Sequence, residues 1–393
     1  MIRNFSADYI VPVSGEPIKE GVIAVNETGE ITKIYDRESA SSITEPIERH
    51  KGIIVPGFVN THCHLELSHL SQKFSKNQGL ISFVKSVIAE RKADEKEILA
   101  AMVKADKAMV ENGIVAVGDN SNNALSKDVK LKSSIYYHTF VEMLGFEPEK
   151  VKQVFDDGIE LKEKFAPLAA SIAPHASYSV CKELFKEIRE YCNEEKNLLT
   201  IHNQESEEEN KFYRYKTGEF IDFYKDLGLD IDFYKPQARD SLQSVIPLLP
   251  KGKKILLVHN IYTSLKDIYF VRRFGRDINW CFCPNSNLYI ENRLPKIDMF
   301  LFDDFNITLG TDSLASNDKL CILSEIRTIN KHFPSIPLTD TIKWATLNGA
   351  KFLGIDRDFG SIEIGKTPGL NLIMDMDIKD FKLTKDSAVK KLL

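Results

Sequence analysis

The sequence predicts an α/β fold in which eight parallel strands, each followed by a helical stretch, close into a barrel. Three observations predict it: short strands gather at both ends of the chain, strands alternate with helical stretches between them, and eight strands can be counted in that middle section. A closed barrel needs eight such units, and its functional residues are expected at the carboxyl ends of the strands. The 393 residues suffice to bury a large core.

Short strands at the two ends of the chain predict a separate small β domain. Turns rich in Gly, Pro and Asn divide these strands, which lie at Asp8–Val13, Gly21–Val25, Ile31–Tyr35, Gly360–Lys366 and Leu370–Met374. We expect the two ends to pair with each other, so that residues 1–52 and 356–393 form the β domain and residues 53–355 form the barrel.

In the middle section, apolar runs of strand length alternate with longer helical patterns. The predicted strands centre on Ile53–Phe58, Ile114–Gly118, Ile135–Val141, Ala169–Ala173, Leu198–Ile201, Ile255–Val258, Asn279–Phe282 and Ile307–Leu309. The helical stretches between them include Phe83–Arg91, Glu97–Glu111, Lys182–Glu195 and Leu265–Phe274. This alternation is typical of a parallel sheet covered by helices.

The first predicted barrel strand leads into a His-x-His pair, His62 and His64. Because side chains alternate along an extended segment, both imidazoles point to the same side. Two imidazoles at a strand end can bind one metal ion and leave positions open for further ligands. On spacing alone, two surface histidines are the commoner explanation, so the metal-ligand interpretation depends on the rest of the chain.

Further polar residues follow the other predicted strands. Nine histidines occur in the chain, and five of them lie at strand ends. The residues at these ends are His62, His64, His175, His202, Glu205, His259 and Asp312. A surface or core histidine has no reason to prefer the carboxyl ends of strands, so this concentration predicts a metal site there.

These motifs together resemble the amidohydrolase superfamily, and within it the mononuclear-metal branch of cytosine, guanine, S-adenosylhomocysteine and 6-aminodeoxyfutalosine deaminases and of chlorohydrolases. The segments that carry the resemblance are Pro56–His64, Cys283–Asn287, Gly310–Asn317 and Ala345–Ala350, with His202 and His259 between them. The resemblance covers nearly the whole chain. It implies a distorted (β/α)8 TIM barrel with a small β-sandwich formed by the N- and C-terminal segments.

The resemblance implies that His62, His64, His202 and Asp312 bind a single divalent metal ion. Three imidazoles and a carboxylate suit zinc, and such a set also accepts iron or manganese. Binuclear relatives use a carboxylated lysine from the fourth strand. The matching stretch, residues 169–175, contains no lysine, which predicts one ion.

Three residues receive catalytic roles from the same resemblance. A metal lowers the pKa of a bound water, and Asp312 would take the proton from that water. His259 would orient the water and stabilise the developing oxyanion. Glu205, three residues after His202, would protonate a ring nitrogen of the substrate. Glu205 also opens an acidic run that ends at Glu209, so a solvated acid is the alternative reading.

Two residues are expected to contact the substrate. The counterpart of His175 does so in the mononuclear branch, although a histidine that only packs the loop is the alternative. Glu66 lies where the pocket mouth is expected, in a segment, His64–Ser68, that resembles a subgroup including 6-aminodeoxyfutalosine deaminases. It could bind ribose hydroxyls, and an acid that starts a helix is an equal reading. His138 and Glu142 on the third strand are further candidates.

The predicted reaction is hydrolytic deamination of an aromatic amidine, in which the amino group is on a carbon next to a ring nitrogen. We expect an adenine nucleoside: 6-aminodeoxyfutalosine first, then S-adenosylhomocysteine or methylthioadenosine. A chlorohydrolase or a cyclic amide hydrolase is the alternative, because the same metal, His259 and Glu205 serve those reactions. A non-catalytic interaction protein is another, although such relatives have usually lost ligands, and here all four are present.

Composition and charge exclude other classes of partner. The chain is 43% hydrophobic and 28% charged, as expected of a soluble globular protein. A net charge of −5 with both signs interspersed argues against a nucleic-acid surface.

No apolar stretch approaches membrane-span length, the N-terminus lacks signal-like regions, and the six cysteines show no disulfide framework. We expect a cytoplasmic protein, a homodimer by resemblance, with a small-molecule substrate.

Overall fold

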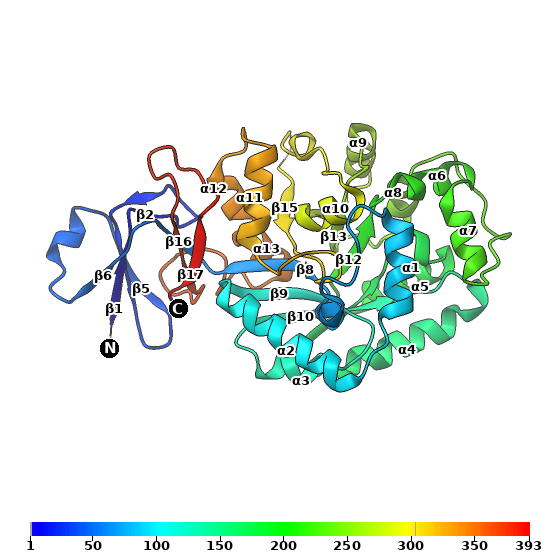
Figure 1. The fold of residues 1–393 in the computed structure, drawn as a ribbon, viewed down its shortest axis with the longest axis horizontal. Coiled ribbons are helices and arrows are strands. Elements are labelled where there is room, and N and C mark those ends of the chain that lie inside the picture. The colour runs from blue at the N-terminus through cyan, green and yellow to red at the C-terminus, as the bar shows by residue number, and fades with distance from the viewer. Residues whose placement is uncertain (1, 303) are drawn as a thin grey trace.

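The computed structural model describes residues 2–302 and 304–393. It consists of a barrel with its surrounding helices and a smaller β-rich part, in which both termini lie (Figure 1). Each of the two parts has its own buried apolar cluster. Among the described residues, no helix has the length and apolar character needed to cross a lipid bilayer.

The β-rich part contains two sheets built from both ends of the chain. One sheet has the order β5-β4-β1-β6, with the strands β1 (Arg3–Ser6), β4 (Val22–Val25), β5 (Ile31–Tyr35) and β6 (Ile47–Arg49). The other has the order β17-β16-β7-β2-β3, with β2 (Tyr9–Ile10), β3 (Ile18–Lys19), β7 (Ile53–Pro56), β16 (Leu370–Met374) and β17 (Ala388–Lys391). Phe5, Ile54 and Leu372 belong to one buried apolar cluster of this part, so both chain ends contribute to its core. The domain boundaries at residues 52 and 356 stay a prediction.

Two predicted strands differ from the structure. The run Ile53–Phe58 is not one barrel strand, because β7 pairs with β16 and β2, and the barrel strand β8 (Phe58–Cys63) begins after Gly57. A side chain on Gly57 would come within 2.3 Å of Val115, so only glycine fits at this break. The strand predicted at Gly360–Lys366 is wrong. Gly360 and Gly365 have φ values of 89° and 88°, which an extended strand does not allow.

Eight parallel strands form the barrel wall. They lie in two four-stranded sheets, ordered β11-β10-β9-β8 and β12-β13-β14-β15. Besides β8, the strands are β9 (Ile114–Ser121), β10 (Tyr136–Met143), β11 (Ala169–Pro174), β12 (Leu199–Asn203), β13 (Lys254–His259), β14 (Asp277–Phe282) and β15 (Asn306–Leu309). The other seven predicted barrel strands correspond to β9–β15.

Parallel bridges join the two sheets at both seams, and each bridge lies at the carboxyl end of the strands. Ala176 pairs with His202 at one seam, and Cys63 pairs with Asp312 at the other. The amide of Asp312 donates to the carbonyl oxygen of His62 at 3.0 Å, and the amide of His202 donates to that of His175 at the same distance. The backbone that closes the barrel therefore also brings the predicted site residues together.

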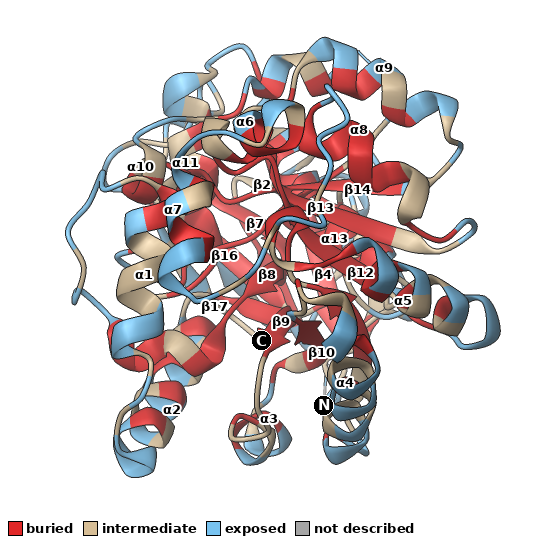
Figure 2. Cartoon of the chain, turned by 90° about the vertical axis from the view of Figure 1, so that its right-hand side faces the viewer, coloured by how far each residue is buried: buried red, intermediate tan, exposed pale blue. Residues whose placement is uncertain are grey.

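Helices cover the outside of the barrel, and their buried faces turn toward the strands (Figure 2). The four predicted helices are confirmed within a few residues at each end. The helices are α1 (Leu80–Glu90), α2 (Glu95–Glu111), α3 (Lys127–Lys132), α4 (Val151–Lys164), α5 (Lys182–Glu194), α6 (Glu207–Tyr215), α7 (Glu219–Asp226), α8 (Ser241–Val245), α9 (Leu265–Arg273), α10 (Pro284–Glu291), α11 (Ile322–His332), α12 (Leu338–Trp344) and α13 (Leu347–Leu353). In α5, for example, Leu184, Ile188 and Cys192 are buried at a spacing of four residues, which places them on one face.

Candidate active site

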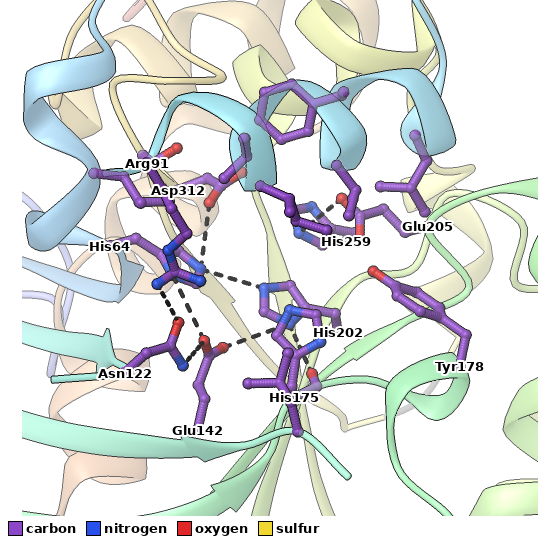
Figure 3. Close-up of a pocket in the computed structure, with 18 residues that line it drawn as sticks. His64, Arg91, Asn122, Glu142, His175, Tyr178, His202, Glu205, His259 and Asp312 are labelled. Atoms are coloured by element: carbon purple, nitrogen blue, oxygen red, sulfur yellow. Dashed lines mark hydrogen bonds and ion pairs between the residues drawn. The ribbon is translucent and has the colours of Figure 1, made fainter. Parts of the chain in front are cut away.

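Donor atoms from both halves of the barrel meet at the carboxyl ends of the strands. The Nε2 atoms of His64 and His202 are 3.3 Å apart, and Asp312 Oδ1 lies 3.6 Å from His64 Nε2 and 3.7 Å from His62 Nε2. Tetrahedral zinc with bonds of about 2.0–2.1 Å holds its donors about 3.4 Å apart. The spacing of these donor atoms therefore fits one ion, and Figure 3 shows three of the four side chains, His64, His202 and Asp312, beside the cavity.

The chemistry of His62 also fits a metal ligand. Its ring is fully buried, and neither ring nitrogen has a hydrogen-bond partner. Leaving a buried polar atom unpaired costs about 1–3 kcal/mol, so coordination would remove part of a penalty that the fold otherwise carries. Burial also lowers the pKa values of His62 and His64 to about 3. Both rings are therefore neutral at physiological pH and have a lone pair to donate.

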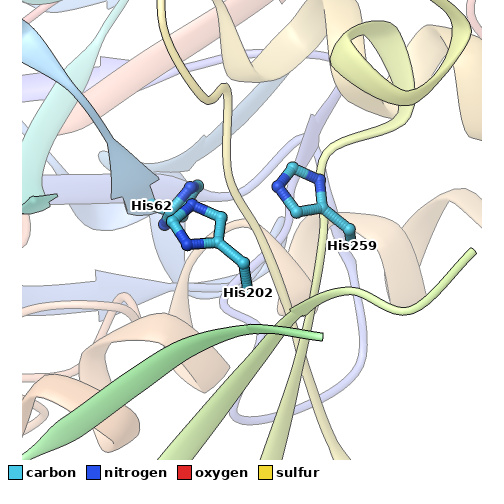
Figure 4. Close-up of side chains that lie close together, drawn as sticks. All are labelled: His62, His202 and His259. Carbon is cyan, nitrogen blue, oxygen red and sulfur yellow. The ribbon is translucent and has the colours of Figure 1, made fainter. Parts of the chain in front are cut away.

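Hydrogen bonds on the opposite ring nitrogens orient two more histidines. His202 Nδ1 donates to the carbonyl oxygen of His175 at 2.7 Å, which leaves Nε2 as the lone-pair atom facing His64. His259 Nδ1 bonds to Asn287 Oδ1 at 2.8 Å. Figure 4 shows His62, His202 and His259 close together, and the rings of His202 and His259 are nearly parallel at an angle of 18°. One nitrogen of each of these three lies within 4.8 Å of the others.

Asp312 is held in an ionised state. Its Oδ2 atom accepts hydrogen bonds from Ser286 at 2.6 Å and Ser316 at 2.7 Å, which leaves Oδ1 facing the histidines. Burial acts to raise the pKa of Asp312, but the imidazoles of His62, His64 and His259 beside it outweigh this and hold the pKa well below its usual range. Asp312 and His259 both have left-handed backbone, with φ values of 57° and 73°. Such strain in non-glycine residues is typical of functional sites.

Glu205 lies just beyond the end of β12, facing the histidines. Its Oε1 atom is 3.5 Å from His259 Nε2, and burial raises its pKa to about 8. A carboxyl group with this pKa is mostly protonated at neutral pH and can act as an acid. The solvated-acid reading of Glu205 does not fit, because the residue is only 5% exposed.

A second buried carboxylate, Glu209, holds the backbone of Glu205. Its Oε2 atom accepts the amide hydrogen of Glu205 at 3.0 Å, and its Oε1 atom accepts that of Gln204 at 3.1 Å and the hydroxyl of Ser177 at 2.7 Å. The sequence pattern had assigned no role to Glu209. The sequence also contained no signal that could have found Glu209, because Glu207–Glu209 are three consecutive acids with nothing to distinguish them. In the structure, the first turn of α6 buries Glu209 alone of the three.

A cavity of about 130 Å³ lies above the donor atoms. Its polar wall consists of His64, Arg91, Asn122, Glu142, His175, Tyr178, His202, Glu205, His259, Asp312 and Ser313. Its apolar wall comes from α1, the short 3₁₀ helix η2 (Leu65–Leu70) and the loop after β10. An apolar cavity with a few convergent polar groups and carboxyl or imidazole groups of shifted pKa is typical of an enzyme active site.

Residues 53–392 match the Amidohydrolase family. The chain belongs to the amidohydrolase family. The predicted family is confirmed, and with it the expectation of an enzyme rather than a non-catalytic interaction protein. A divalent metal ion suits this amidohydrolase, because the buried His and Asp donors are spaced for one.

Comparison with known proteins finds relatives over nearly the whole length of this amidohydrolase. An adenosine deaminase of Helicobacter pylori is 27% identical over 351 residues, which cover 87% of this chain and 82% of that protein. The solved structure of Helicobacter pylori aminofutalosine deaminase in complex with methylthio-coformycin has a TM-score of 0.81 and 22% identity, over 94% of this chain and 92% of that one. An adenosine deaminase from Xanthomonas campestris with bound zinc has a TM-score of 0.75 and 21% identity, over 96% and 85%. The predicted barrel fold is confirmed.

The two predicted substrate contacts of this amidohydrolase lie in different places. His175 lines the cavity, and its Nδ1 atom bonds to Ser179 Oγ at 2.7 Å. Glu66 is buried and does not line the cavity. It accepts hydrogen bonds from Arg91 at 3.1 Å and from the backbone amide of Asn122 at 3.0 Å. The substrate-binding role of Glu66 stays a prediction, and the structure puts the Arg91 side chain between it and the cavity.

Of the two further candidates on β10, Glu142 and His138, only Glu142 lines the cavity. Glu142 lines the cavity, where its carboxylate oxygens lie 4.0 Å from His64 Nδ1 and 3.8 Å from His202 Nδ1. It can therefore stabilise the orientation of two candidate ligands from outside. His138 does not line the cavity. It lies deeper in the barrel, with Nε2 bonded to Ser171 Oγ at 2.9 Å, and burial lowers its pKa to about 4.

Proposed function

We propose that this amidohydrolase is a metal-dependent deaminase that converts the amino group of an adenine nucleoside to a carbonyl and releases ammonia. The observation that carries the proposal is Glu205, a buried carboxyl group with its pKa raised to about 8. It lines the cavity above the donor cluster, which is the set of side chains His62, His64, His202 and Asp312. An aromatic amidine needs a proton on its ring nitrogen before water adds at the neighbouring carbon. The names of the related adenosine and aminofutalosine deaminases support the same chemistry.

His62, His64, His202 and Asp312 are the proposed ligands of one divalent ion, with zinc first and iron or manganese also suited to the set. When bound, the ion lowers the pKa of a water molecule toward neutrality. The relative from Xanthomonas campestris contains zinc, which supports this choice. The absence of lysine from β11 supports one ion rather than two.

The protein's own groups divide the proton transfers. Ionised Asp312 accepts a proton from the attacking water, and protonated Glu205 donates one to the ring nitrogen. The proton on Asp312 then goes to the departing amino group, which leaves as ammonia, and the proton of the added hydroxyl restores Glu205 as the carbonyl forms. His259 donates its Nδ1 proton to Asn287, so neutral His259 presents Nε2 as an acceptor that orients the water. The other role predicted for His259, stabilising the oxyanion, requires a proton on Nε2, which the imidazolium or the other tautomer carries.

We propose a substrate in which the adenine ring lies between Glu205 and the donor cluster, while the sugar extends toward His175 and Tyr178. Both of these side chains line the same cavity as Glu205. We keep 6-aminodeoxyfutalosine as the first candidate, before S-adenosylhomocysteine and methylthioadenosine. A cytoplasmic homodimer that binds neither nucleic acid nor membrane stays our prediction.

The proposal is tested with purified, zinc-loaded protein and a panel of substrates. Ammonia release and the change in purine absorbance are followed with adenine nucleosides, free guanine, cytosine and pterins, and product release with a chlorinated triazine and a cyclic amide. We expect turnover of adenine nucleosides. Turnover of free bases or pterins alone would reject the nucleoside, and turnover of only the triazine or the amide would reject deamination.

A further inference from the structure

A buried carboxyl group outside the cavity joins two segments of the candidate active site. Glu325 lies on α11, is fully buried and does not line the cavity above the donor cluster. Its Oε2 atom accepts the backbone amide hydrogen of Asn285 at 2.9 Å. Its Oε1 atom accepts hydrogen bonds from the side-chain amides of Asn285 and Asn317, both also at 2.9 Å. Glu325 therefore connects the start of α10 with the segment that follows β15.

Both of these segments bind the same carboxylate oxygen. Ser286 follows Asn285 in the chain, and Ser316 precedes Asn317. The hydroxyls of the two serines donate to Asp312 Oδ2 at 2.6 Å and 2.7 Å. Each asparagine that binds the buried acid is therefore next to a serine that orients the proposed metal ligand.

The first turn of α10 is held by α11 at further points. The Nδ2 atom of Asn285 also donates to Ser324 Oγ at 3.1 Å, and its Oδ1 atom accepts the hydroxyl hydrogen of Thr328 at 2.5 Å. The same turn contains Asn287, which bonds to His259 Nδ1. Contacts from the neighbouring helix therefore fix a turn that supports two of the proposed catalytic side chains.

Neither the burial of Glu325 nor the backbone of Asp312 is favourable by itself. A carboxyl group loses its hydration when it is buried, and the partners of Glu325 are neutral amides rather than a lysine or an arginine. Asp312 has a left-handed backbone with a φ value of 57°, which persists only where the surroundings hold it. A role of Glu325 in holding the segment around Asp312 accounts for both observations.

We propose that Glu325 is a positioning residue, which keeps Asp312 Oδ1 directed at the three histidines by holding Ser286 and Ser316 in place. The inference rests on the proposed function, in which Asp312 binds the ion and accepts a proton from the attacking water. Glu325 acts only through its neighbours, because it does not line the cavity. Groups that orient a metal ligand from outside typically contribute about 10–100-fold to metal affinity or activity.

The test removes the acceptor oxygens of Glu325 and measures metal binding as well as turnover. Glu325→Leu should weaken zinc binding by about 10–100-fold, measured by competition with a chromogenic chelator. At saturating zinc, kcat for the best adenine nucleoside should fall by a similar factor while KM changes by less than about twofold, because the substrate contacts are untouched. Glu325→Gln keeps one acceptor oxygen and should lie between the leucine variant and the wild type. Wild-type zinc affinity and kcat in Glu325→Leu overturn the inference.

A double-mutant cycle determines whether Glu325 acts through the two serines. Ser286→Ala and Ser316→Ala together remove both hydroxyls from Asp312, and Glu325→Leu is then added to that protein. If Glu325 acts through these hydroxyls, its replacement in this background should lower zinc affinity and kcat by less than about threefold further. Losses that multiply in full, as they do for independent sites, show that Glu325 acts in another way and contradict the proposal.

A milder matched pair of variants answers the same question if leucine at position 325 prevents folding. Thr328→Val removes the hydroxyl that donates to Asn285, and it should lower zinc affinity and kcat by about two- to fivefold, since one neutral hydrogen bond is lost. The control is Thr341→Val on α12, where the hydroxyl donates to the carbonyl oxygen of Leu338 at 2.9 Å within the same helix. The control should keep both wild-type values, and equal behaviour of the two variants refutes the positioning role.

Failure of this inference can be told apart from failure of the proposed function, because zinc affinity is measured without substrate. If nucleosides react and Glu325→Leu equals the wild type in zinc affinity and kcat, deamination stands and the positioning role is wrong. If no nucleoside releases ammonia but Glu325→Leu weakens zinc binding, the positioning role stands and the proposed reaction is wrong. If the wild type binds no zinc, both fail.

Discussion

Replacing Glu209 by Gln tests how the catalytic acid is positioned. Glu209 is fully buried and accepts three hydrogen bonds, two of them from the consecutive backbone amides of Gln204 and Glu205. Gln204 has a left-handed backbone with a φ value of 45°, so the segment needs support from its surroundings. Glutamine keeps the shape of the side chain but replaces one acceptor oxygen by an NH₂ group. One backbone N–H group then faces the NH₂ group of the glutamine, and two donors cannot form a hydrogen bond with each other.

The size of the effect follows from that mismatch. A buried amide without an acceptor costs about 1–3 kcal/mol, which the segment can relieve by moving. A displacement of about 1 Å at a catalytic group lowers the rate by roughly a hundredfold. We therefore expect Glu209→Gln to lower kcat by about 10- to 100-fold, with a much smaller change in KM.

The pH profile separates positioning of Glu205 from a general loss of stability. Burial is the largest cause of the raised pKa of Glu205, and the charge of Glu209 adds to it. Glu205 acts in its protonated form, so activity falls as the pH rises through its pKa of about 8. Glu209→Gln removes the nearby charge, and the alkaline limb of kcat should move to lower pH.

The control is Glu207→Gln, which makes the same chemical change at an acid in the same helical turn. Glu207 is 41% exposed on its side chain and pairs with Arg214 at 3.2 Å, away from the backbone of Glu205. Both variants and the wild type are compared for kcat and pH profile at equal zinc content. If Glu209→Gln behaves like Glu207→Gln in both measurements, the positioning argument is refuted.

Four further outcomes are expected. Glu205→Gln should lower kcat by about 10²–10⁴-fold and leave the metal content unchanged, since a neutral amide has no proton to give; near-normal rates would reject its role. Metal analysis should find one tightly bound ion per chain, lost in His202→Ala, and two ions would contradict the single-metal site. His259→Asn should lower kcat by about a hundredfold or more, and retention of the wild-type rate would exclude it from catalysis. Burial raises the pKa of Glu325 from 4.5 to about 8. The unfolded chain therefore releases this proton from about pH 4.5 while the folded protein keeps it until about pH 8, so stability is lost as the pH rises across that window. Glu325→Gln should lose less stability than the wild type between pH 5 and pH 8 in urea unfolding, and an equal loss in both proteins would contradict the shifted pKa.

Local patterns in the sequence determined the strands and the identity of most side chains around the donor cluster. Alternation of apolar runs with helical stretches is a property of neighbouring residues, so it predicted seven of the eight barrel strands as the structure has them. The polar residues at strand ends likewise predicted a metal site, from which the resemblance selected His62, His64, His202 and Asp312, because all parallel strands of a barrel end on one face. Pro56-Gly57 indicates a bend after Val55, but no local signal shows that β7 and β8 belong to different sheets, and the need for glycine at position 57 depends on Val115, which lies on another strand.

Only the tertiary structure decided which polar residues support the site and what shape the cavity takes. Glu66 and Arg91 are 25 residues apart in the chain, and only folding shows that the acid is buried behind the arginine. Asn60 and Thr311 are 251 residues apart and join β8 to the segment after β15. The apolar cavity that adjoins the active site combines α1, the loops after β10 and β11, and α7, none of which contains a recognisable motif. Contacts of this kind depend on barrel closure and on the packing of loops, which the periodicity of a single segment does not encode.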